Sequence, residues 1–367
     1  MKRKLSVSFF LHILICTGVF LTSTPATGET GRELLDLSGI KGGLIVCLNS
    51  SDEIATADLL VAEQYRVQGL FRDEERVQSE RLKVQTKGCY GSVWVKHLQA
   101  NSLPYVDNLV NLIIAEDYGS IPTDELFRVL APNGVLLTKR EINIHDSGFT
   151  ISASGMQGGW KKAVKPWPSG MDEWTHWMHG PDNNPVSSDT ISEIPRGLQW
   201  RGAPVWQKSH EQTPSLDAMV TAKGRLFNIM DEAASGVGNM PDKWFLNARD
   251  AFNGIQLWKL PIKEWGGEYW MKQPNQHARM FSGTYQVFRR LVAVDDQVFT
   301  TLGMHAPVSA LDAATGQVLR SYAGTEKTFE ILCRDNTLLL AVNHALDNKS
   351  AKPDVSIMAV DHTTGDI

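Results

Sequence analysis

The chain has 367 residues, 42% of them hydrophobic and 21% charged, with a formal net charge of −5. This length predicts two or three domains, and the composition is that of a folded protein. A net acidic chain gives no reason to expect nucleic acid as a partner, because nucleic-acid binding usually needs a basic face.

The N-terminus has the pattern of a targeting segment. Positively charged residues at positions 2–4 precede an apolar run over 5–21, and small residues follow at 24–26. This pattern predicts a secretory signal peptide over residues 1–28. The alternative is an uncleaved membrane anchor, since the run is nearly long enough to span a bilayer. We therefore expect an exported, periplasmic or extracellular protein, anchored if the segment is uncleaved.

Four widely spaced cysteines are present: Cys16, Cys47, Cys89 and Cys333. Their spacing matches neither a disulfide framework nor a metal site. Cys47 lies in an apolar, strand-like run and is predicted to be a small core residue.

Residues 38–140 alternate between strand and helix patterns. The expected strands cover 43–48, 65–70, 93–96, 109–115 and 135–138, with helices over 54–63, 73–87 and 122–130 and a turn at 132–134. Alternation of this kind predicts an α/β domain, a parallel sheet with helices on its faces.

A transition over 141–172 is rich in glycine and proline, with one expected strand pair at 149–152 and 161–165. From 173 to 367 the rhythm changes to short strands separated by turn residues. This change indicates an all-β sandwich, barrel or propeller.

An internal repeat favours the propeller. The segment 247–258 aligns with 309–320, and 358–367 matches the first part of both. Each copy has an aspartate followed four residues later by a glycine, and the aspartates recur 62 and 49 residues apart, about one four-stranded blade.

The repeat has a physical interpretation. Each aspartate ends a strand and can bind turn N–H groups, and the glycine can adopt a left-handed conformation. The next strand carries a large residue, Trp258 in the first copy, expected to pack between blades. The structural residues of the repeat are Asp250, Gly254, Trp258, Asp312, Gly316, Asp361 and Gly365. Only three or four blades fit in 173–367, so we expect a partial propeller within a longer protein.

The repeat resembles that of pyrroloquinoline-quinone (PQQ)-type propellers, which occur in quinoprotein dehydrogenases and in a non-catalytic outer-membrane assembly lipoprotein. Residues 174–184 resemble the first segment of such propellers. With the stretches 103–117, 128–134 and 164–168, the chain resembles exported bacterial proteins that carry a methyltransferase-like domain ahead of a PQQ-like propeller.

The first domain resembles class I S-adenosylmethionine (SAM)-dependent methyltransferases. The resemblance implies a glycine-rich cofactor loop after the first strand and an acidic residue after the second. Here the loop is Asn49, Ser50, Ser51, Asp52 and Glu53, without glycine, and Phe71 stands in place of the acid. Both departures predict a degenerate, non-catalytic Rossmann-like domain.

Three further groups are candidate sites. His176, His179 and Asp182 could bind a metal, although hydrogen bonding that closes the first blade is the favoured interpretation. Trp200 and Trp206 could stack on a ligand, although packing between blades is favoured. A candidate propeller pocket consists of residues near strand ends: His210, Glu211, Asp217, Asp231 and Glu232.

The sequence thus favours a binding or scaffold module for a protein or polysaccharide ligand, with no assigned cofactor or metal. One alternative is a PQQ-dependent alcohol or sugar dehydrogenase with PQQ and Ca²⁺, although the adjacent cysteine pair of those enzymes is not in the sequence. A second alternative is a SAM-dependent methyltransferase.

Overall fold

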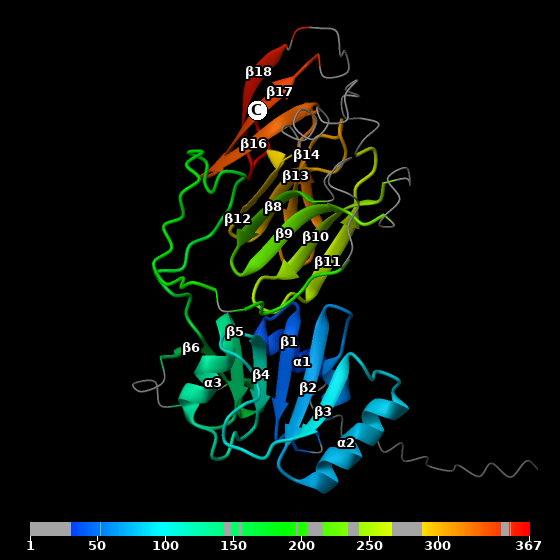
Figure 1. Cartoon of the computed structure of the whole chain (residues 1–367), viewed down its shortest axis with the longest axis vertical. Helices are drawn as coiled ribbons and strands as arrows, with labels where there is room; N and C mark the ends of the chain where they lie inside the picture. Colours follow the sequence, from blue (N-terminus) through cyan, green and yellow to red (C-terminus); the bar gives the residue numbers. More distant parts are fainter. Residues whose placement is uncertain are drawn as a thin grey trace, which may run out of the picture.

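The computed structural model describes residues 31–51, 53–142, 148–153, 156–195, 197–204, 216–233, 242–265, 288–345, 352 and 354–367. The predicted signal peptide lies outside these ranges. Within them, no helix is long and apolar enough to cross a membrane. The described residues form an α/β domain and three antiparallel sheets (Figure 1).

The α/β domain is built on one seven-stranded sheet. Its strands are β1 (Gly43–Leu48), β2 (Tyr65–Phe71), β3 (Val93–His97), β4 (Val110–Ala115), β5 (Leu130–Thr138), β6 (Thr150–Ala153) and β7 (Lys161–Val164). Their order is β3-β2-β1-β4-β5-β7-β6, parallel from β1 to β5, with the β6–β7 hairpin antiparallel at one edge. The order reverses between β1 and β4, as in doubly wound α/β folds.

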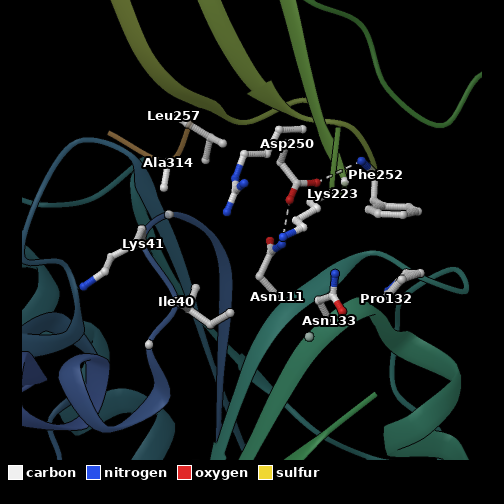
Figure 2. Close-up of a pocket in the computed structure, with 15 residues that line it drawn as sticks. Ile40, Lys41, Asn111, Pro132, Asn133, Lys223, Asp250, Phe252, Leu257 and Ala314 are labelled. Atoms are coloured by element: carbon white, nitrogen blue, oxygen red, sulfur yellow. Dashed lines mark hydrogen bonds between the residues drawn. The ribbon is translucent and has the colours of Figure 1, made fainter. Parts of the chain in front are cut away.

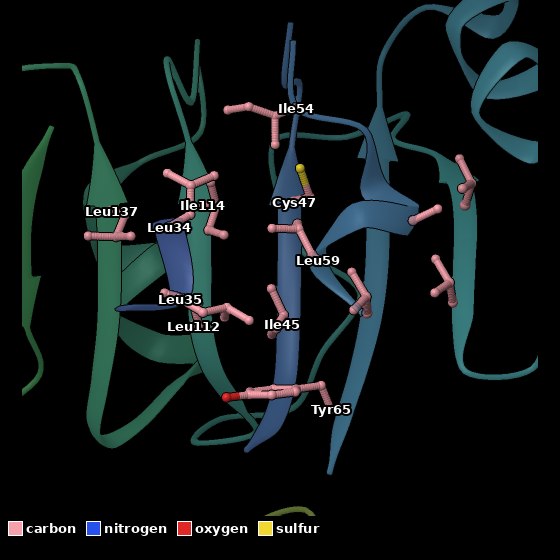
Figure 3. Close-up of a cluster of buried hydrophobic side chains, with 14 of the residues drawn as sticks. Leu34, Leu35, Ile45, Cys47, Ile54, Leu59, Tyr65, Leu112, Ile114 and Leu137 are labelled. Carbon is pink, nitrogen blue, oxygen red and sulfur yellow. The ribbon is translucent and has the colours of Figure 1, made fainter. Parts of the chain in front are cut away.

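Helices cover both faces of this sheet. They are α1 (Gly31–Ser38), η1 (Thr56–Leu59), α2 (Glu74–Thr86), α3 (Thr123–Val129) and η2 (Gln157–Gly159). One core contains side chains of α1, η1 and α2, and Figure 3 shows part of it along β1, β4 and β5. Cys47 is fully buried there, which confirms its predicted role. A second core, with residues of α3, covers the opposite face.

Most strands of this domain, together with α2 and α3, confirm the sequence pattern, which predicted helices over 73–87 and 122–130. Asp73 caps α2 by accepting hydrogen bonds from the N–H groups of Glu75 and Arg76, and Gly88 follows the helix with φ +64°. α1 is a helix that the sequence pattern did not predict.

Two local predictions are wrong. The helix predicted over 54–63 is reduced to η1, because Leu60 leaves the helical region (ψ 76°) and the backbone bonds here span three residues, such as Asp58 N–H to the Ala55 carbonyl (2.9 Å). The turn predicted at 132–134 lies within β5, because Asn133 and Gly134 exchange backbone hydrogen bonds with Lys165. Asn133 takes a φ of +62°, and the chain bulges there without ending the strand.

The three remaining sheets follow one another along the chain. The first sheet contains β8 (Leu216–Ala222), β9 (Arg225–Asp231), β10 (Trp244–Asp250) and β11 (Gln256–Pro261). The second contains β12 (Leu291–Val294), β13 (Gln297–Thr301), β14 (Val308–Asp312) and β15 (Val318–Ser321), and the third β16 (Thr328–Arg334), β17 (Thr337–Asn343) and β18 (Val355–Asp361). Each is an antiparallel meander in chain order. Apolar cores fill the first-to-second and second-to-third interfaces.

The same turn follows the third strand of each sheet. Asp250, Asp312 and Asp361 each accept two backbone hydrogen bonds through Oδ1, from the residues two and three positions later. The glycine four positions after each aspartate has a φ between +73° and +87° and donates to the aspartate carbonyl.

A large side chain from a neighbouring segment covers each of these glycines. Trp258 of the first sheet lies over Gly316 of the second and donates from Nε1 to the Ala313 carbonyl (2.9 Å). Trp200 repeats this arrangement over Gly254, and Arg320 of the second sheet covers Gly365 of the third. The contact that joins one sheet to the next is therefore repeated along the chain.

The first sheet rests on the amino-terminal edge of the α/β sheet (Figure 1). Asn111, near the start of β4, donates to the Asp250 carboxylate (2.6 Å), and Asn253 donates to Asn111 Oδ1 (2.7 Å) and to the Leu109 carbonyl (3.0 Å). The carboxyl ends of β1 to β5 consequently face away from the β-rich part.

Candidate functional site

The carboxyl edge of the α/β sheet is the first candidate site. In doubly wound sheets ligands bind where the strand order reverses, outside the carboxyl ends of the strands. Here that position lies between β1 and β4. It brings together the loop after β1, which contains Asn49, Ser50 and Ser51, and Glu116, which follows β4.

The loop after β1 is bound by the chain's own side chains. The Ser51 N–H donates to Glu116 Oε2 (2.9 Å), and the Ser51 carbonyl accepts from Arg76 Nη2 (2.7 Å). Asn49, with φ +43°, accepts through Oδ1 from the N–H of Arg72 (3.1 Å). The backbone groups that a glycine-rich loop would direct to a ligand are thus used within the protein.

A third loop residue, Ser50, is also held internally. Its hydroxyl donates to the Ile54 carbonyl (3.0 Å). Glu53 is exposed, and Asp52 lies outside the described residues. These contacts fix the loop's course without any ligand.

The Glu116 carboxylate is held in its charged form. Burial raises its pKa, but hydrogen bonds from Lys139 and Ser51 outweigh burial, and the pKa is below its ordinary value. Lys139 Nζ lies 2.9 Å from Glu116 Oε1. Glu116 is therefore ionised at neutral pH and accepts the Ser51 N–H as a carboxylate.

Phe71 occupies the end of β2, where the methyltransferase resemblance implies a ribose-binding acid. Its side chain is 2% exposed and belongs to the core shared with Ile45 and Cys47. The Arg76 guanidinium lies 5.5 Å from the ring centre. An apolar ring beneath a cation offers no acceptor for ribose hydroxyls.

The second candidate, the propeller pocket, is described only in part. His210 and Glu211 and the side chain of Asp217 lie outside the described residues. Asp231 is buried and accepts from the N–H groups of Ala233 (3.0 Å) and Lys243 (2.8 Å). Glu232 pairs with Lys259 of β11. Asp231 and Glu232 thus hold the first sheet together at the end of β9.

The His-x-x-His segment has a structural environment. His176 is 2% exposed, accepts the Cys333 N–H at Nε2 (3.0 Å) and contacts Thr175 Oγ1 through Nδ1 (2.7 Å). Burial lowers the pKa of His176 to about 4. His179 bonds to Asp172 instead (2.7 Å). The described residues contain no group of three or more His, Cys, Asp or Glu side chains that could hold a metal.

The same segment joins all three β-sheets. The Trp174 carbonyl accepts from Thr221 of β8 (2.7 Å), and the Thr175 carbonyl accepts from Ala293 of β12 (3.0 Å). With the bond from Cys333 of β16, the segment 174–176 contacts the first strand of every sheet. The sequence pattern suggested only that this segment closes the first sheet. The structure shows that it also contacts the other two sheets.

A small cavity of about 110 Å³ lies at the junction of the α/β domain and the first sheet (Figure 2). Asp250 and Asn111 form one of its walls. Burial raises the pKa of Asp250, although Asn111 and two turn N–H groups oppose the rise. The equivalent Asp361 is only partly buried, and its turn bonds lower its pKa to about 2. The aspartate pKa is thus raised in the turn that faces the α/β domain and lowered in the equivalent turn of the third sheet.

Two of the three cationic residues that line this cavity, Lys223 and Arg225, have ion-pair partners. Lys223 pairs with Asp296 (3.0 Å) and Asp295 (3.3 Å), and Arg225 pairs with Asp296 (3.0 Å). The cavity is therefore part of a polar junction between the two parts of the chain.

Solved methyltransferases match part of this chain. One is a SAM-dependent methyltransferase from Aquifex aeolicus, 20% identical, with a TM-score of 0.31; the match covers 38% of this chain and 91% of that one. The Haloferax volcanii complex of the Trm112 methyltransferase activator with a putative methyltransferase matches at 15% identity, TM-score 0.31, 39% of this chain and 90% of that one. A putative SAM-dependent methyltransferase from Methanococcus maripaludis matches at 13% identity, TM-score 0.27, 29% of this chain and 52% of that one.

These values describe a likeness of fold and carry nothing about activity. No protein-family model matches the sequence, and no curated protein matches it. The described residues themselves show a doubly wound α/β domain followed by three antiparallel sheets.

Two features of the sites were missed at the sequence level. Glu116 directly follows β4, a position at the carboxyl edge that could have marked it as a partner of the loop after β1. Asn253 stands where the other two copies have Thr315 and Thr364, and this departure from the repeat is the signal for the domain junction.

Proposed function

We propose that this chain is a non-catalytic binding or scaffold protein, in which the three antiparallel sheets are neighbouring blades of a PQQ-like β-propeller and the α/β domain is a structural support. The main support for a non-catalytic α/β domain is that the loop after β1 is bound by the protein's own side chains. Ser51 is bound on both sides by Glu116 and Arg76, and Phe71 removes the ribose acceptor.

The repeated junction between sheets supports the blade assignment. Three equivalent turns are each covered by a side chain of a neighbouring segment, and two of these contacts, Trp258 over Gly316 and Arg320 over Gly365, join successive sheets. The segment 174–176 binds the first strand of each sheet, as expected if these strands surround a common axis. Propellers offer binding surfaces to protein or polysaccharide ligands, and we propose one of these as the partner class.

A titration calorimetry experiment tests the proposal. SAM and S-adenosylhomocysteine are titrated to 1 mM into the full chain, beside an active methyltransferase as positive control. We expect no saturable heat from this protein while its thermal melt shows that it is folded. Binding at micromolar affinity would refute the non-catalytic assignment.

SAM-dependent methyl transfer is the second candidate. Its supporting observation is the reversal of strand order between β1 and β4, with a carboxyl edge that the β-rich part does not cover. The same titration distinguishes the two candidates, because only this one requires a saturable SAM site.

PQQ-dependent oxidation remains an alternative that rests on the sequence resemblance. Absorbance spectra with PQQ and Ca²⁺ added, together with dye reduction by alcohols and sugars, test it directly. Quinone binding with dye reduction would establish this activity, and the absence of both would remove it.

Export is proposed from the N-terminal pattern alone. N-terminal sequencing of the protein from a bacterial host's periplasmic fraction tests it. A start near residue 29 supports a cleaved signal, and an intact Met1 in the cytoplasmic fraction contradicts export.

A further inference from the structure

A groove of about 720 Å³ runs beside β3, the edge strand of the α/β sheet, on the side away from β2. Its walls come from the C-terminal half of α2, the following turn and β3. The lining residues are Arg81, Val84, Gln85, Tyr90, Trp94, Val95 and Lys96. A volume of this size is that of a ligand site.

The groove follows the open edge of β3. Neighbouring residues of a strand point to opposite faces of the sheet, and Trp94 and Val95 both line the groove. The Arg81 side chain reaches from α2 to this edge, where its Nε donates to the Val95 carbonyl (3.2 Å), so the groove extends to the edge of β3. The occupant would therefore lie beside the backbone of β3.

The backbone of β3 presents hydrogen-bonding groups to this edge. Ser92 accepts from the Val67 N–H of β2 (3.0 Å), and Leu98 donates to the Phe71 carbonyl of β2 (2.8 Å). Since the bonding direction alternates along a strand, the even-numbered residues face β2 and Val95 faces outward. At this edge the Val93 N–H donates to the Cys89 carbonyl (3.0 Å), and the Val95 carbonyl accepts from Arg81 Nε (3.2 Å) with one lone pair still open. The Val95 N–H points the same way and is the donor that an added strand would use.

The groove is both aromatic and cationic. Tyr90 is 80% exposed, an unusual position for a large ring, and Trp94 is half-buried. Among the described residues, neither Arg81 nor Lys96 has an ion-pair partner, whereas nearby Lys87 is paired with Asp58. On a chain of net charge −5, these two cations form a local positive site.

We propose that an extended acidic peptide segment of a partner protein binds this groove as an added strand beside β3. Backbone pairing with an edge strand supplies affinity, and alternate side chains supply specificity. Acidic side chains complement Arg81 and Lys96, and the rings of Tyr90 and Trp94 cover the peptide. A second copy of the chain is disfavoured as the occupant. Antiparallel pairing of β3 with β3 of a second copy, about a two-fold axis perpendicular to the sheet, would bring two cationic grooves together. The proposal does not depend on the propeller assignment.

The test uses a fluorescein-labelled peptide of eight alternating threonine and glutamate residues, with fluorescence anisotropy on the full chain at 50 and 300 mM NaCl. We expect saturable binding that weakens at the higher salt, and at least tenfold weaker binding to Lys96→Glu. The matched control is Lys352→Glu, the same charge change at an exposed lysine outside the groove, which leaves binding unchanged.

Two further peptides separate strand pairing from simple charge attraction. A peptide with the same sequence but N-methylated at every residue has no backbone donors for pairing and is expected not to bind. A threonine–lysine peptide is also expected not to bind. Equal affinity for the N-methylated peptide, or equal affinity of wild type and Lys96→Glu, overturns the proposal.

The remaining occupants are outcomes of the same assay. If polygalacturonate binds with a dependence on Lys96 and the peptide does not, the groove takes an acidic polysaccharide and the proposal is wrong. If light scattering shows a dimer that Lys96→Glu dissociates, the occupant is a second copy, and the proposal is equally wrong.

Discussion

The contact between Trp258 and Gly316 allows a sharp test of how one sheet joins the next. Replacing Gly316 by alanine would place a Cβ 2.7 Å from Trp258 Cδ2, closer than real contacts. The φ of +73° adds strain of about 1–2 kcal/mol for any L-residue, and overpacking adds about 1–3 kcal/mol. We therefore expect Gly316→Ala to lower the free energy of unfolding by about 2–5 kcal/mol.

Gly324 provides the matched control in the same part of the chain. Its φ is +89°, but the nearest atom to an added Cβ is Ile367 Cδ1 at 3.7 Å, an ordinary contact. Gly324→Ala should therefore lose only the strain, about 1–2 kcal/mol. The measurement is urea unfolding of the full chain followed by tryptophan fluorescence, with equal m-values required for the comparison.

A double-mutant cycle identifies the clashing partner. In the background of Trp258→Leu there is room for the new methyl group, so Gly316→Ala should cost only about 1–2 kcal/mol. Equal losses for Gly316→Ala and Gly324→Ala, within about 0.5 kcal/mol, would contradict the packing of Trp258 over this turn. The same conclusion would follow if Gly316→Ala lowered the free energy of unfolding equally in the wild-type and Trp258→Leu backgrounds.

The remaining predictions concern the segment 174–176 and the junction between the α/β domain and the first sheet. Because burial holds the pKa of His176 at about 4, below its ordinary value, the unfolded chain takes up a proton that the folded chain does not between pH 6.5 and 4. The free energy of unfolding should thus fall by roughly 3 kcal/mol between pH 6.5 and pH 4. Urea midpoints measured across this range should lose this pH dependence in His176→Gln. They should keep it when the exposed His97 is replaced. Asn253→Thr, which restores the residue of the other repeats, removes the bonds to Leu109 and Asn111 and should cost about 1–2 kcal/mol at the junction. A thermal melt that is unchanged in Asn253→Thr would show that these bonds do not hold the two parts together.

The strands of this protein could be predicted from sequence because their signals are local. The run Gly43–Leu48 is apolar throughout and becomes a strand buried on both faces, with the predicted bounds. The repeated Asp-to-Gly turn needs only its own side chain and one left-handed residue. Such features do not depend on distant parts of the chain.

The errors and omissions concern contacts between distant residues. The helix predicted over 54–63 is limited to η1, which packs in one core with residues of α1 and α2, and no local pattern announces these distant partners. The pair Asn111 and Asp250 is far apart in sequence and forms only when the domains meet. Likewise, the sequence marked the segment 174–176 as unusual but did not reveal that it contacts three sheets.

The most direct test of the central claim is a crystal structure of the full chain grown with 5 mM SAM. Our account predicts no SAM density at the carboxyl edge, with the Ser51 N–H still bound to Glu116 and Phe71 still in the core. SAM density between β1 and β4, with Glu116 displaced from Ser51, would contradict it.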